Sequence, residues 1–342
     1  MYKTPYGTPR RTRLVAPFAL LVPLVLFAGL FFGGSYLMTP DPEIEIKAGI
    51  GTGRVAGRDV VLVPYERSGP RGMWQLMFHD MFQVRLAAVD PRDGRVLWDV
   101  QLSDRLVWDA AVVAAGERYA FVATASGPVL LDLVDGSHVA GPDDIAGLGA
   151  KFVASPDAYV YDPEGRRVLT VDSDGTVLAI PVDGTAAQPV DVPGWRPEKI
   201  RRSESTTASE ASLGDDKITV RERSGAPGEV LARGTGIGTE VFHGARIVVD
   251  GGRAVGAEAG RILVVHDRSV NDRSAAVSAV SLTTGAVTAT LPLGSSGVDR
   301  AVVLPDGTAA IATDDEVVVA TPEGRLTRLE VGDTDFFGTP SR

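Results

Sequence analysis

Hydrophobic and polar positions alternate over short distances along most of the chain, and they indicate paired strands rather than long helices. The stretch Val84–Leu102, VRLAAVDPRDGRVLWDVQL, is the clearest example. It holds an apolar strand, a tight Asp-Gly turn and a second apolar strand that carries Trp98. This pattern predicts an antiparallel β-hairpin. Strand-like runs begin earlier, at Glu43–Lys47 and Val60–Pro64.

Variants of this hairpin recur along the chain. Thr124–Gly136 and Asp172–Gly184 each hold a turn with Gly, an apolar strand and a second turn ending in Asp-Gly, and their two glycines are nine residues apart. Thr313–Gly324 has the same form with one residue fewer. A further strand is predicted before each unit, at Tyr119–Ala123, Arg167–Val171 and Ala309–Ala312. Glycine supplies the positive φ that two-residue hairpin turns need, so we expect consecutive antiparallel hairpins.

The turn glycines set the period of the repeat. With the looser copies Lys217–Ala232 and Ser281–Leu293 included, they are Gly94, Gly136, Gly184, Gly228, Gly285 and Gly324. Successive glycines lie 42, 48, 44, 57 and 39 residues apart. A period near 42 predicts one four-stranded propeller blade per unit, and residues 43–335 then hold about seven. The predicted fold class is therefore all-β, a single β-propeller with seven blades, with six or eight as alternatives. A β-sandwich would leave the period unexplained.

The N-terminal segment has the pattern of a membrane anchor. Residues 1–13 carry four positive charges, and no charged residue occurs from Leu14 to Pro40. Leu14–Met38 would span about 37 Å as a helix, enough for a hydrocarbon core of about 30 Å. Basic residues on the N-terminal side predict a cytoplasmic N-terminus and an extracytoplasmic body. A cleaved signal peptide, cut near Gly33-Gly34-Ser35, is the alternative, although the apolar run is long for one.

These signals together predict the domain organisation. It comprises a cytoplasmic tail (1–13), a transmembrane helix (14–38), a linker (39–43), an extracytoplasmic propeller (44–335) and a C-terminal tail (336–342). The expected location is the cell membrane, crossed once.

Composition excludes several classes of function. The chain has no Cys, which excludes disulfides, thiolate zinc sites and cysteine nucleophiles. Its net charge is −10, and the body after residue 40 has 30 basic and 44 acidic residues. Such an acidic body argues against nucleic-acid binding and against lying flat on anionic lipid.

Candidate catalytic and metal sites each have a simpler interpretation. His79, His138, His243 and His266 are too scattered for paired metal ligands. Asp172–Gly175 begins like a calcium loop, but Val177 stands where the loop requires Gly, so a turn is favoured. Asp143-Asp144 and Asp314-Asp315 are also expected in turns, and Gly234–Gly238, GTGIG, in a turn between blades. We expect no catalytic residues, no cofactor and no metal ion.

The segment Met73–Val84, MWQLMFHDMFQV, is the most unusual one. Its methionines and its aromatic residues each recur at every fourth position: Met73, Met77 and Met81, and Trp74, Phe78 and Phe82. As a helix, the segment would present a deformable apolar stripe to a partner or a membrane. As a strand, it would fill the core between blades. The polar stretches Ser203–Leu213 and His266–Ala275 are expected to be exposed loops.

One unit resembles a known family. Ala88, Asp90, Gly94 and Trp98 match the repeat Ala-x-Asp-x-x-x-Gly-x-x-x-Trp of the pyrroloquinoline-quinone-type propellers, and Leu304–Thr313 is similar to the Pro-Asp-Gly turn of the related YVTN-like repeats. The resemblance implies a tryptophan packed between blades. The family includes quinone-dependent dehydrogenases, which use adjacent cysteines, and non-enzymatic members that scaffold envelope assemblies. Because this chain has no Cys, the resemblance favours a non-enzymatic member.

The predicted function is that of a binding or scaffold module in the bacterial cell envelope, with a protein or small-ligand partner. The alternative is an extracytoplasmic enzyme, either a quinoprotein-like oxidoreductase or a hydrolase or lyase that uses Asp and His at the propeller funnel.

Overall fold

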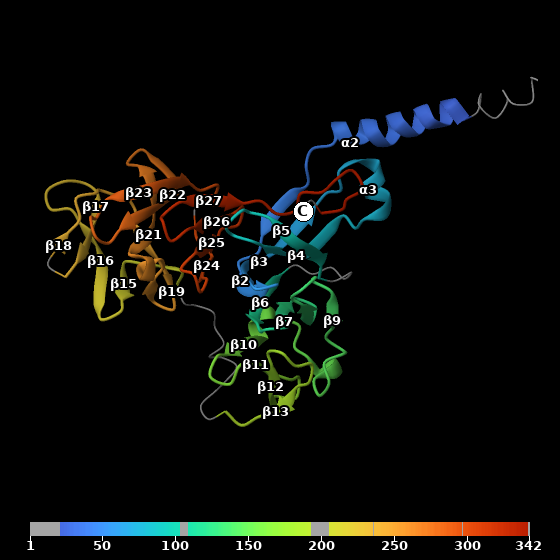
Figure 1. Cartoon of the computed structure of the whole chain (residues 1–342), viewed down its shortest axis with the longest axis horizontal. Coiled ribbons are helices and arrows are strands. Elements are labelled where there is room, and N and C mark those ends of the chain that lie inside the picture. Colours follow the sequence, from blue (N-terminus) through green and yellow to red (C-terminus); the bar gives the residue numbers. More distant parts are fainter. Residues whose placement is uncertain (1–20, 103–108, 193–204, 235, 296, 341–342) are drawn as a thin grey trace, which may run out of the picture. The chain divides into compact units, whose positions relative to one another are not determined.

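The computed structural model describes residues 21–102, 109–192, 205–234, 236–295 and 297–340 (Figure 1). The chain forms two compact units. The first comprises residues 1–43, 68–81 and 334–340, and the second holds almost all of the strands. The expected cytoplasmic tail, residues 1–13, and the start of the expected membrane helix lie outside the described residues.

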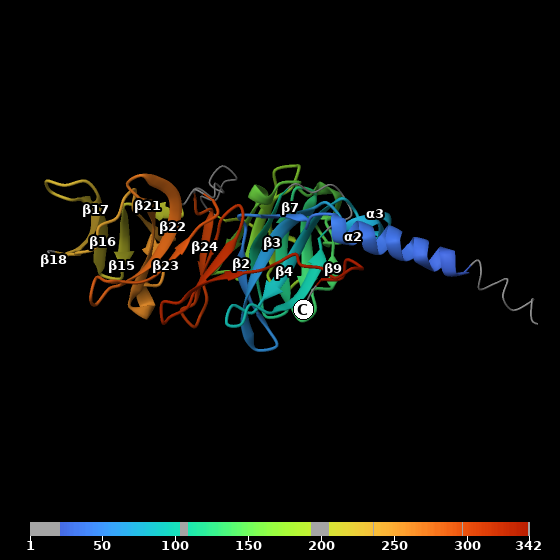
Figure 2. The ribbon, with the colours of Figure 1, turned by 90° about the horizontal axis from the view of Figure 1, so that it is seen from above.

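The second unit is a series of antiparallel four-stranded sheets, which we call blades 1 to 6 (Figures 1 and 2). Blade 1 has an extra strand and comprises β1 (Glu43–Ile46), β2 (Gly51–Val55), β3 (Arg58–Ser68), β4 (Phe82–Val89) and β5 (Val96–Gln101). Blade 2 comprises β6 (Ala110–Ala115), β7 (Tyr119–Thr124), β8 (Gly127–Asp132) and β9 (His138–Ala140). Blade 3 comprises β10 (Tyr159–Asp162), β11 (Arg167–Val171), β12 (Val177–Pro181) and β13 (Gln188–Pro189).

The ten-stranded sheet consists of blades 4 and 5, joined at their inner edges by β20 (Arg253–Ala254). Blade 4 comprises β15 (Glu210–Leu213), β16 (Asp216–Glu222), β17 (Glu229–Arg233) and β18 (Gly236–Ile237). Blade 5 comprises β19 (Arg246–Asp250), β21 (Arg261–Ser269), β22 (Asp272–Ser281) and β23 (Val287–Pro292), with β14 (Thr207–Ala208) beside β19. Blade 6 comprises β24 (Arg300–Val303), β25 (Ala309–Ala312), β26 (Val317–Ala320) and β27 (Leu326–Leu329). Short 3-10 turns occur at Gly149–Lys151, Pro156–Ala158 and Ala257–Ala259.

The predicted β-propeller fold is confirmed, and the described residues form six blades, the lower alternative, rather than seven. Five of the six turn glycines lie between the last two strands of a blade, whereas Gly228 lies between β16 and β17, the second and third strands of blade 4. The division by length overcounted because residues 43–67 join the hairpin after them in blade 1, while residues 68–81 belong to the first unit.

The recurring turn is longer than the two-residue turn expected from the sequence. In blades 1, 2 and 5, the Gly N–H donates to the carbonyl four residues earlier, at Asp90, Asp132 and Ser281. The side chain at that earlier position accepts from the N–H two residues on, at 2.8–3.3 Å. The three glycines have φ of 71–74°. The Asp and Gly of the repeat are therefore explained by one turn, closed by a side-chain hydrogen bond and a left-handed residue.

Blades pack face to face through buried apolar side chains, and blades 1, 2, 5 and 6 each contribute to two such clusters, one on each face. In β3, Val60 and Leu62 pack toward blade 2, whereas Val61 and Val63 pack toward blade 6, as the alternation of a strand dictates. Equivalent apolar clusters join blades 2 and 3, 4 and 5, and 5 and 6. The contact between blades 1 and 6 brings the two ends of the blade series together.

Trp98 lies between blades 1 and 2. Its side chain is buried, and its Nε1–H donates to the Leu133 carbonyl at 2.9 Å. A Cβ on Gly136 would lie 2.7 Å from the indole ring. The neighbouring turn of blade 2 is thus shaped around this ring.

The first unit contains two helices. The N-terminal helix runs from Leu21 to Met38 in the described residues, with a π-helical stretch, η1 (Gly29–Gly33), and a last turn, α2 (Gly34–Met38). It is long and apolar enough to cross a membrane. The short helix α3 (Gly72–Phe78) and the stretch Thr334–Pro340 pack in the same unit. Most of the expected C-terminal tail therefore has a defined place.

Three expectations about local structure need correction. Residues 205–213, expected as part of an exposed loop, contain β14 and β15. The polar stretch His266–Ala275 forms the ends of β21 and β22, because its side chains alternate across a long hairpin. Met73–Val84 forms neither one helix nor one strand: α3 ends at Phe78, and β4 begins at Phe82.

Replacing Trp98 with Ala tests the packing between blades. We expect the free energy of unfolding to fall by about 3–5 kcal/mol, because an aromatic side chain is removed from a closed core. Trp98→Phe is the matched control and should cost less, since it keeps a ring and loses one hydrogen bond worth about 1 kcal/mol. Urea unfolding of the full chain in detergent, followed by circular dichroism, measures both. If Trp98→Ala lowered the free energy of unfolding no more than Trp98→Phe does, the packing of Trp98 between blades would not contribute to stability as proposed.

Candidate functional site

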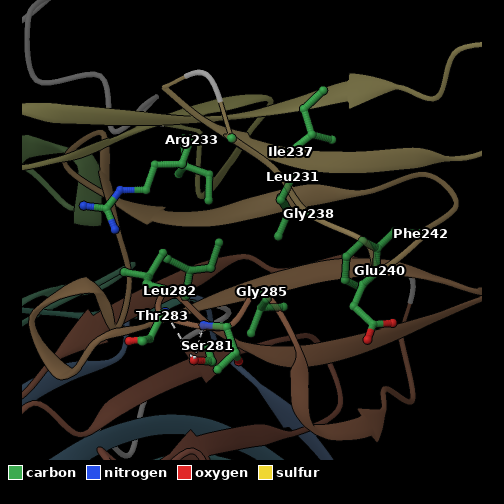
Figure 3. A pocket seen from close by; sticks show the side chains of 15 residues that line it. Leu231, Arg233, Ile237, Gly238, Glu240, Phe242, Ser281, Leu282, Thr283 and Gly285 are labelled. Carbon is green, nitrogen blue, oxygen red and sulfur yellow. Dashed lines mark hydrogen bonds between the residues drawn. The ribbon is translucent and has the colours of Figure 1, made fainter.

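A groove lies between blades 4 and 5, with a cavity of about 290 Å³ (Figure 3). Its floor is apolar and consists of buried residues from both blades: Ile218, Leu231, Phe242, Ile262 and Val280. Its rim is formed by the stretch after β17 on one side and by the β22–β23 turn, residues 281–285, on the other. The volume is at the lower end of the range for ligand sites, about 300–1,000 Å³, and suits one large side chain or a small ligand.

The groove is open because the outer strand of blade 4 is very short. β18 pairs with β17 at only two positions, and Ile237 at its end is 63% exposed. Figure 3 shows Ile237, Leu231 and Phe242 on one side of the groove, with Leu282 and Ser281 opposite. An apolar group that entered would therefore contact both blades.

The polar groups at the rim are few. Arg233 pairs with Asp216 at 2.7 Å, and the Thr283 N–H donates to Ser281 Oγ at 3.3 Å. Glu240 is the remaining ionisable residue in the lining. This chemistry suits recognition of an apolar group with a polar surround, and it supplies no nucleophile paired with a base.

Sequence reasoning missed this groove. Gly234–Gly238 was expected to be a turn between blades, and it supplies β18 and part of the rim. The available signal was Ile237, an apolar residue between glycines. Residues 281–285, which form the other side of the groove, lie more than forty positions after Ile237, so sequence spacing could not show that the two stretches are neighbours.

The methionine and aromatic residues singled out in the sequence divide between two environments. Met73 and Trp74 are half-buried in the first unit, where the Trp74 ring lies 5.5 Å from Phe32 and 4.9 Å from Phe78. Met77, Phe78 and Met81 are 55–61% exposed. Phe82 belongs to the second unit and is also exposed, at the start of β4. Their role as a partner surface stays a prediction.

One Ser–His pair has the spacing of a nucleophile and a base. His266 Nε2 lies 2.8 Å from Ser278 Oγ, and His266 Nδ1 lies 2.7 Å from the Asp267 carbonyl oxygen. The Ser278 hydroxyl also contacts Thr290 Oγ1 at 2.7 Å, and only 1% of the residue is exposed. A substrate could not reach this oxygen, so the row of three side chains ties β21, β22 and β23 together.

A second polar cluster is buried in blade 1. Tyr65 donates a hydrogen bond to Asp99, and Arg85 Nε donates to the same carboxylate at 2.9 Å. Burial raises the pKa of Asp99 above its ordinary value, and the Arg85 guanidinium opposes that rise. Burial likewise raises the pKa of the Tyr65 hydroxyl. Both carboxylate oxygens have partners, so the cluster stabilises the sheet by joining β3, β4 and β5.

The remaining acidic candidates lie in turns and at blade edges. Asp172 Oδ1 accepts from the N–H groups of Asp174 and Thr176, and Asp174 pairs with Lys151. Asp144 Oδ2 accepts from the Gly141 N–H at 3.0 Å. Burial and the nearby Asp314 raise the pKa of Asp299. In the described part of the chain, no group of three or more His, Asp or Glu residues has the arrangement of a metal site.

The blade motif residues serve the fold. Ala88 and Trp98 are opposite each other in the β4–β5 pairing, and both are buried. Asp90 and Gly94 form the turn described above.

Comparison with known proteins gives distant structural likenesses only. No protein-family model and no curated protein matches the sequence. Similar solved structures include BamB from Moraxella catarrhalis, at 14% identity and a TM-score of 0.31, over 81% of this chain and 83% of that one. The C-terminal WD40 domain of Sif2 is similar at 11% identity and a TM-score of 0.31, over 83% of this chain and 86% of that one. The Dos1 propeller is similar at 10% identity and a TM-score of 0.24, over 89% of this chain and 78% of that one. These values are too low to transfer a role.

A serine-directed fluorophosphonate tests whether Ser278 is a nucleophile. We expect no labelling, because its hydroxyl is buried and shared between His266 and Thr290. Ser278→Ala should lower the free energy of unfolding by about 1–3 kcal/mol, since two polar groups lose a partner. The exposed Ser224→Ala is the control and should be neutral. Stoichiometric labelling that Ser278→Ala abolishes would instead identify an enzyme.

Proposed function

We propose that this protein is a single-pass membrane protein whose β-propeller acts outside the cytoplasm as a binding or scaffold module of the bacterial cell envelope. It would be a non-enzymatic propeller of the pyrroloquinoline-quinone-like type. The observation that carries the binding role is the groove between blades 4 and 5, an apolar cavity left open beside the exposed side chain of Ile237.

The proposed occupant of the groove is an apolar side chain from a partner polypeptide. The floor offers only apolar contact, and the cavity holds about one such side chain. The exposed edge of β18 beside it could pair with the backbone of an extended segment. The rim then supplies polar groups that fix orientation.

Retention of the N-terminal helix supports the membrane location. Ser35 Oγ accepts from the Met73 N–H at 2.9 Å, and Tyr36 contacts Phe336 at 5.2 Å between ring centroids. A Cβ on Gly72 would lie 2.7 Å from the Tyr36 backbone. Ser35 and Tyr36 would remain after cleavage near Gly33, but Phe32 would be removed, and its ring packs edge-on against Trp74 at 5.5 Å between centroids. A cleaved signal peptide needs no such partner, so this contact favours a permanent anchor.

The proposed orientation of the helix in the membrane follows from the basic residues that precede it. The four basic residues before Leu14 are expected to stay in the cytoplasm. The propeller then follows on the outer side.

Mass spectrometry of the protein from native membranes tests retention of the anchor. The full N-terminal segment should be present, and alkaline carbonate should not extract the protein. External protease should digest the propeller in spheroplasts but not in intact right-side-out cells with their envelope. A mature N-terminus at or after Gly34 would refute the anchor, and protection of the propeller in spheroplasts would reverse the topology.

A photo-crosslinking residue at Ile237 tests the binding role. It should give a discrete adduct in native membranes, whereas the same residue at the exposed Val270, on the β21–β22 turn, should not. Ile237→Asp should weaken binding of the identified partner roughly ten- to hundredfold, because burying an isoleucine contributes about 1.5–3 kcal/mol. Val270→Asp is the control. Equal adducts at both positions, or unchanged affinity of Ile237→Asp, would exclude this groove.

A further inference from the structure

We infer that the exposed apolar surface of the first unit inserts into the outer interface of the bilayer that its own N-terminal helix crosses. This surface, called the interfacial surface below, consists of Leu76, Met77, Phe78, Met81 and Phe337. The inference rests on the proposed retention of the anchor, and its occupant is lipid rather than a partner protein.

Contacts within the first unit place the interfacial surface at the end of the membrane helix. The Trp74 ring packs edge-on against Phe32 and lies 5.7 Å from Phe337. The Tyr36 ring contacts Phe336. Both α3 and residues 334–340 are thus fixed to the last turns of the helix that carries the hydrophobic span.

The length of the span sets the depth of these turns. A membrane helix needs about 20 residues, and counted from Leu14, the first residue of the uncharged run, it reaches Gly33. The turn Gly34–Met38 would then lie among the lipid headgroups. Tyr36 and Trp74 are at this level, where such side chains are enriched because one end is apolar and the other polar.

Exposure and charge distinguish the interfacial surface from an ordinary protein surface. Leu76, Met77 and Phe78 are three consecutive apolar residues, each 44–61% exposed. Two nearby polar side chains, Arg71 and Gln75, are directed into the unit. Arg71 pairs with Asp41 and lies over the Tyr36 ring, and the buried Gln75 donates to the Asp335 carbonyl at 2.9 Å. Asp80 and Asp335 are exposed beside these apolar residues. In the inferred arrangement the two carboxylates face the headgroups and water, while the five apolar side chains enter the interface.

The interfacial surface is pre-formed in the folded protein. Gly72 and Gly338 have positive φ, and a Cβ at either would meet Tyr36 or His79 at 2.5–2.7 Å. His79 Nε2 lies 2.7 Å from the Phe337 carbonyl oxygen. These close approaches hold α3 and the 334–340 stretch in one arrangement, so little order has to be gained on insertion.

The net charge of the body indicates which interaction drives insertion of the interfacial surface into the bilayer. An acidic propeller gains nothing from anionic headgroups. Insertion is therefore expected to be driven by burial of apolar side chains, and to proceed equally well in neutral lipid.

Single-cysteine labelling can test the inference, since the chain has no Cys of its own. The full chain, with an environment-sensitive fluorophore at Met77→Cys or Phe337→Cys, is reconstituted in phosphatidylcholine vesicles that contain spin-labelled lipids. Leu24→Cys in the helix is the positive control, and Val270→Cys on the propeller is the negative control. Shallow spin labels should quench Met77 and Phe337, deep ones should quench Leu24, and neither should quench Val270. Added anionic lipid should not change this pattern.

Each other outcome has a defined meaning. If Met77 and Phe337 behave like Val270 while Leu24 is quenched, the inference is wrong and the anchor stands. If Leu24 is also not quenched, the anchor itself fails. If Met77 is shielded from water in native membranes but not in lipid vesicles, the occupant is a protein and the inference is overturned. Phe78→Asp should reduce quenching at Phe337, whereas Val270→Asp should not.

Discussion

The structure depends on sheets that are apolar on both faces, as in blades 1, 2, 5 and 6, and that therefore need a neighbour on each side. In β3, four consecutive residues, Val60–Val63, are fully buried, and alternate side chains enter different clusters. An isolated blade would expose both of those faces to water. Packing the first blade against both the second and the sixth removes this exposure, and the same solution recurs along the series.

The inner strand of blade 2 meets that requirement with small residues. β6 reads AAVVAA, and a Cβ on Gly51 of β2 would lie 2.4 Å from Val112. Backbones of neighbouring blades can therefore approach closely near their inner edges. Larger side chains gather farther out, where Trp98 fills the space between blades 1 and 2.

Local pattern was enough to predict much of the fold. Arg167–Val171 and Ala309–Ala312 are strands with the bounds expected from the sequence. Their signal is strong because both the apolar run and the glycine turn act within a dozen residues. The predicted number of blades was less accurate. It came from dividing residues 43–335 by the repeat period, although residues 68–81 belong to the first unit and not to a blade.

The candidate sites were harder to predict, because they depend on residues that are distant in sequence. Nothing within Met73–Val84 indicates that Phe32, Tyr36 and Phe336 will pack with α3, so the pattern left both a core and a surface interpretation of the segment open, with the core favoured. The groove likewise needs Ile237 beside the turn at 281–285. Two short hairpins, each unremarkable alone, create it only where blades 4 and 5 meet.

The composition of the first unit from three separate stretches, 21–43, 68–81 and 334–340, bears on how the molecule is assembled. In the proposed membrane protein the helix would enter the membrane early in synthesis, yet Phe336 and Phe337 become available only after all six blades have been made. The aromatic packing of the first unit is thus the last to be completed. A proposed anchored chain that stalled in its final blade would leave this aromatic packing incomplete, and an unfinished copy would thereby differ from a finished one next to the membrane.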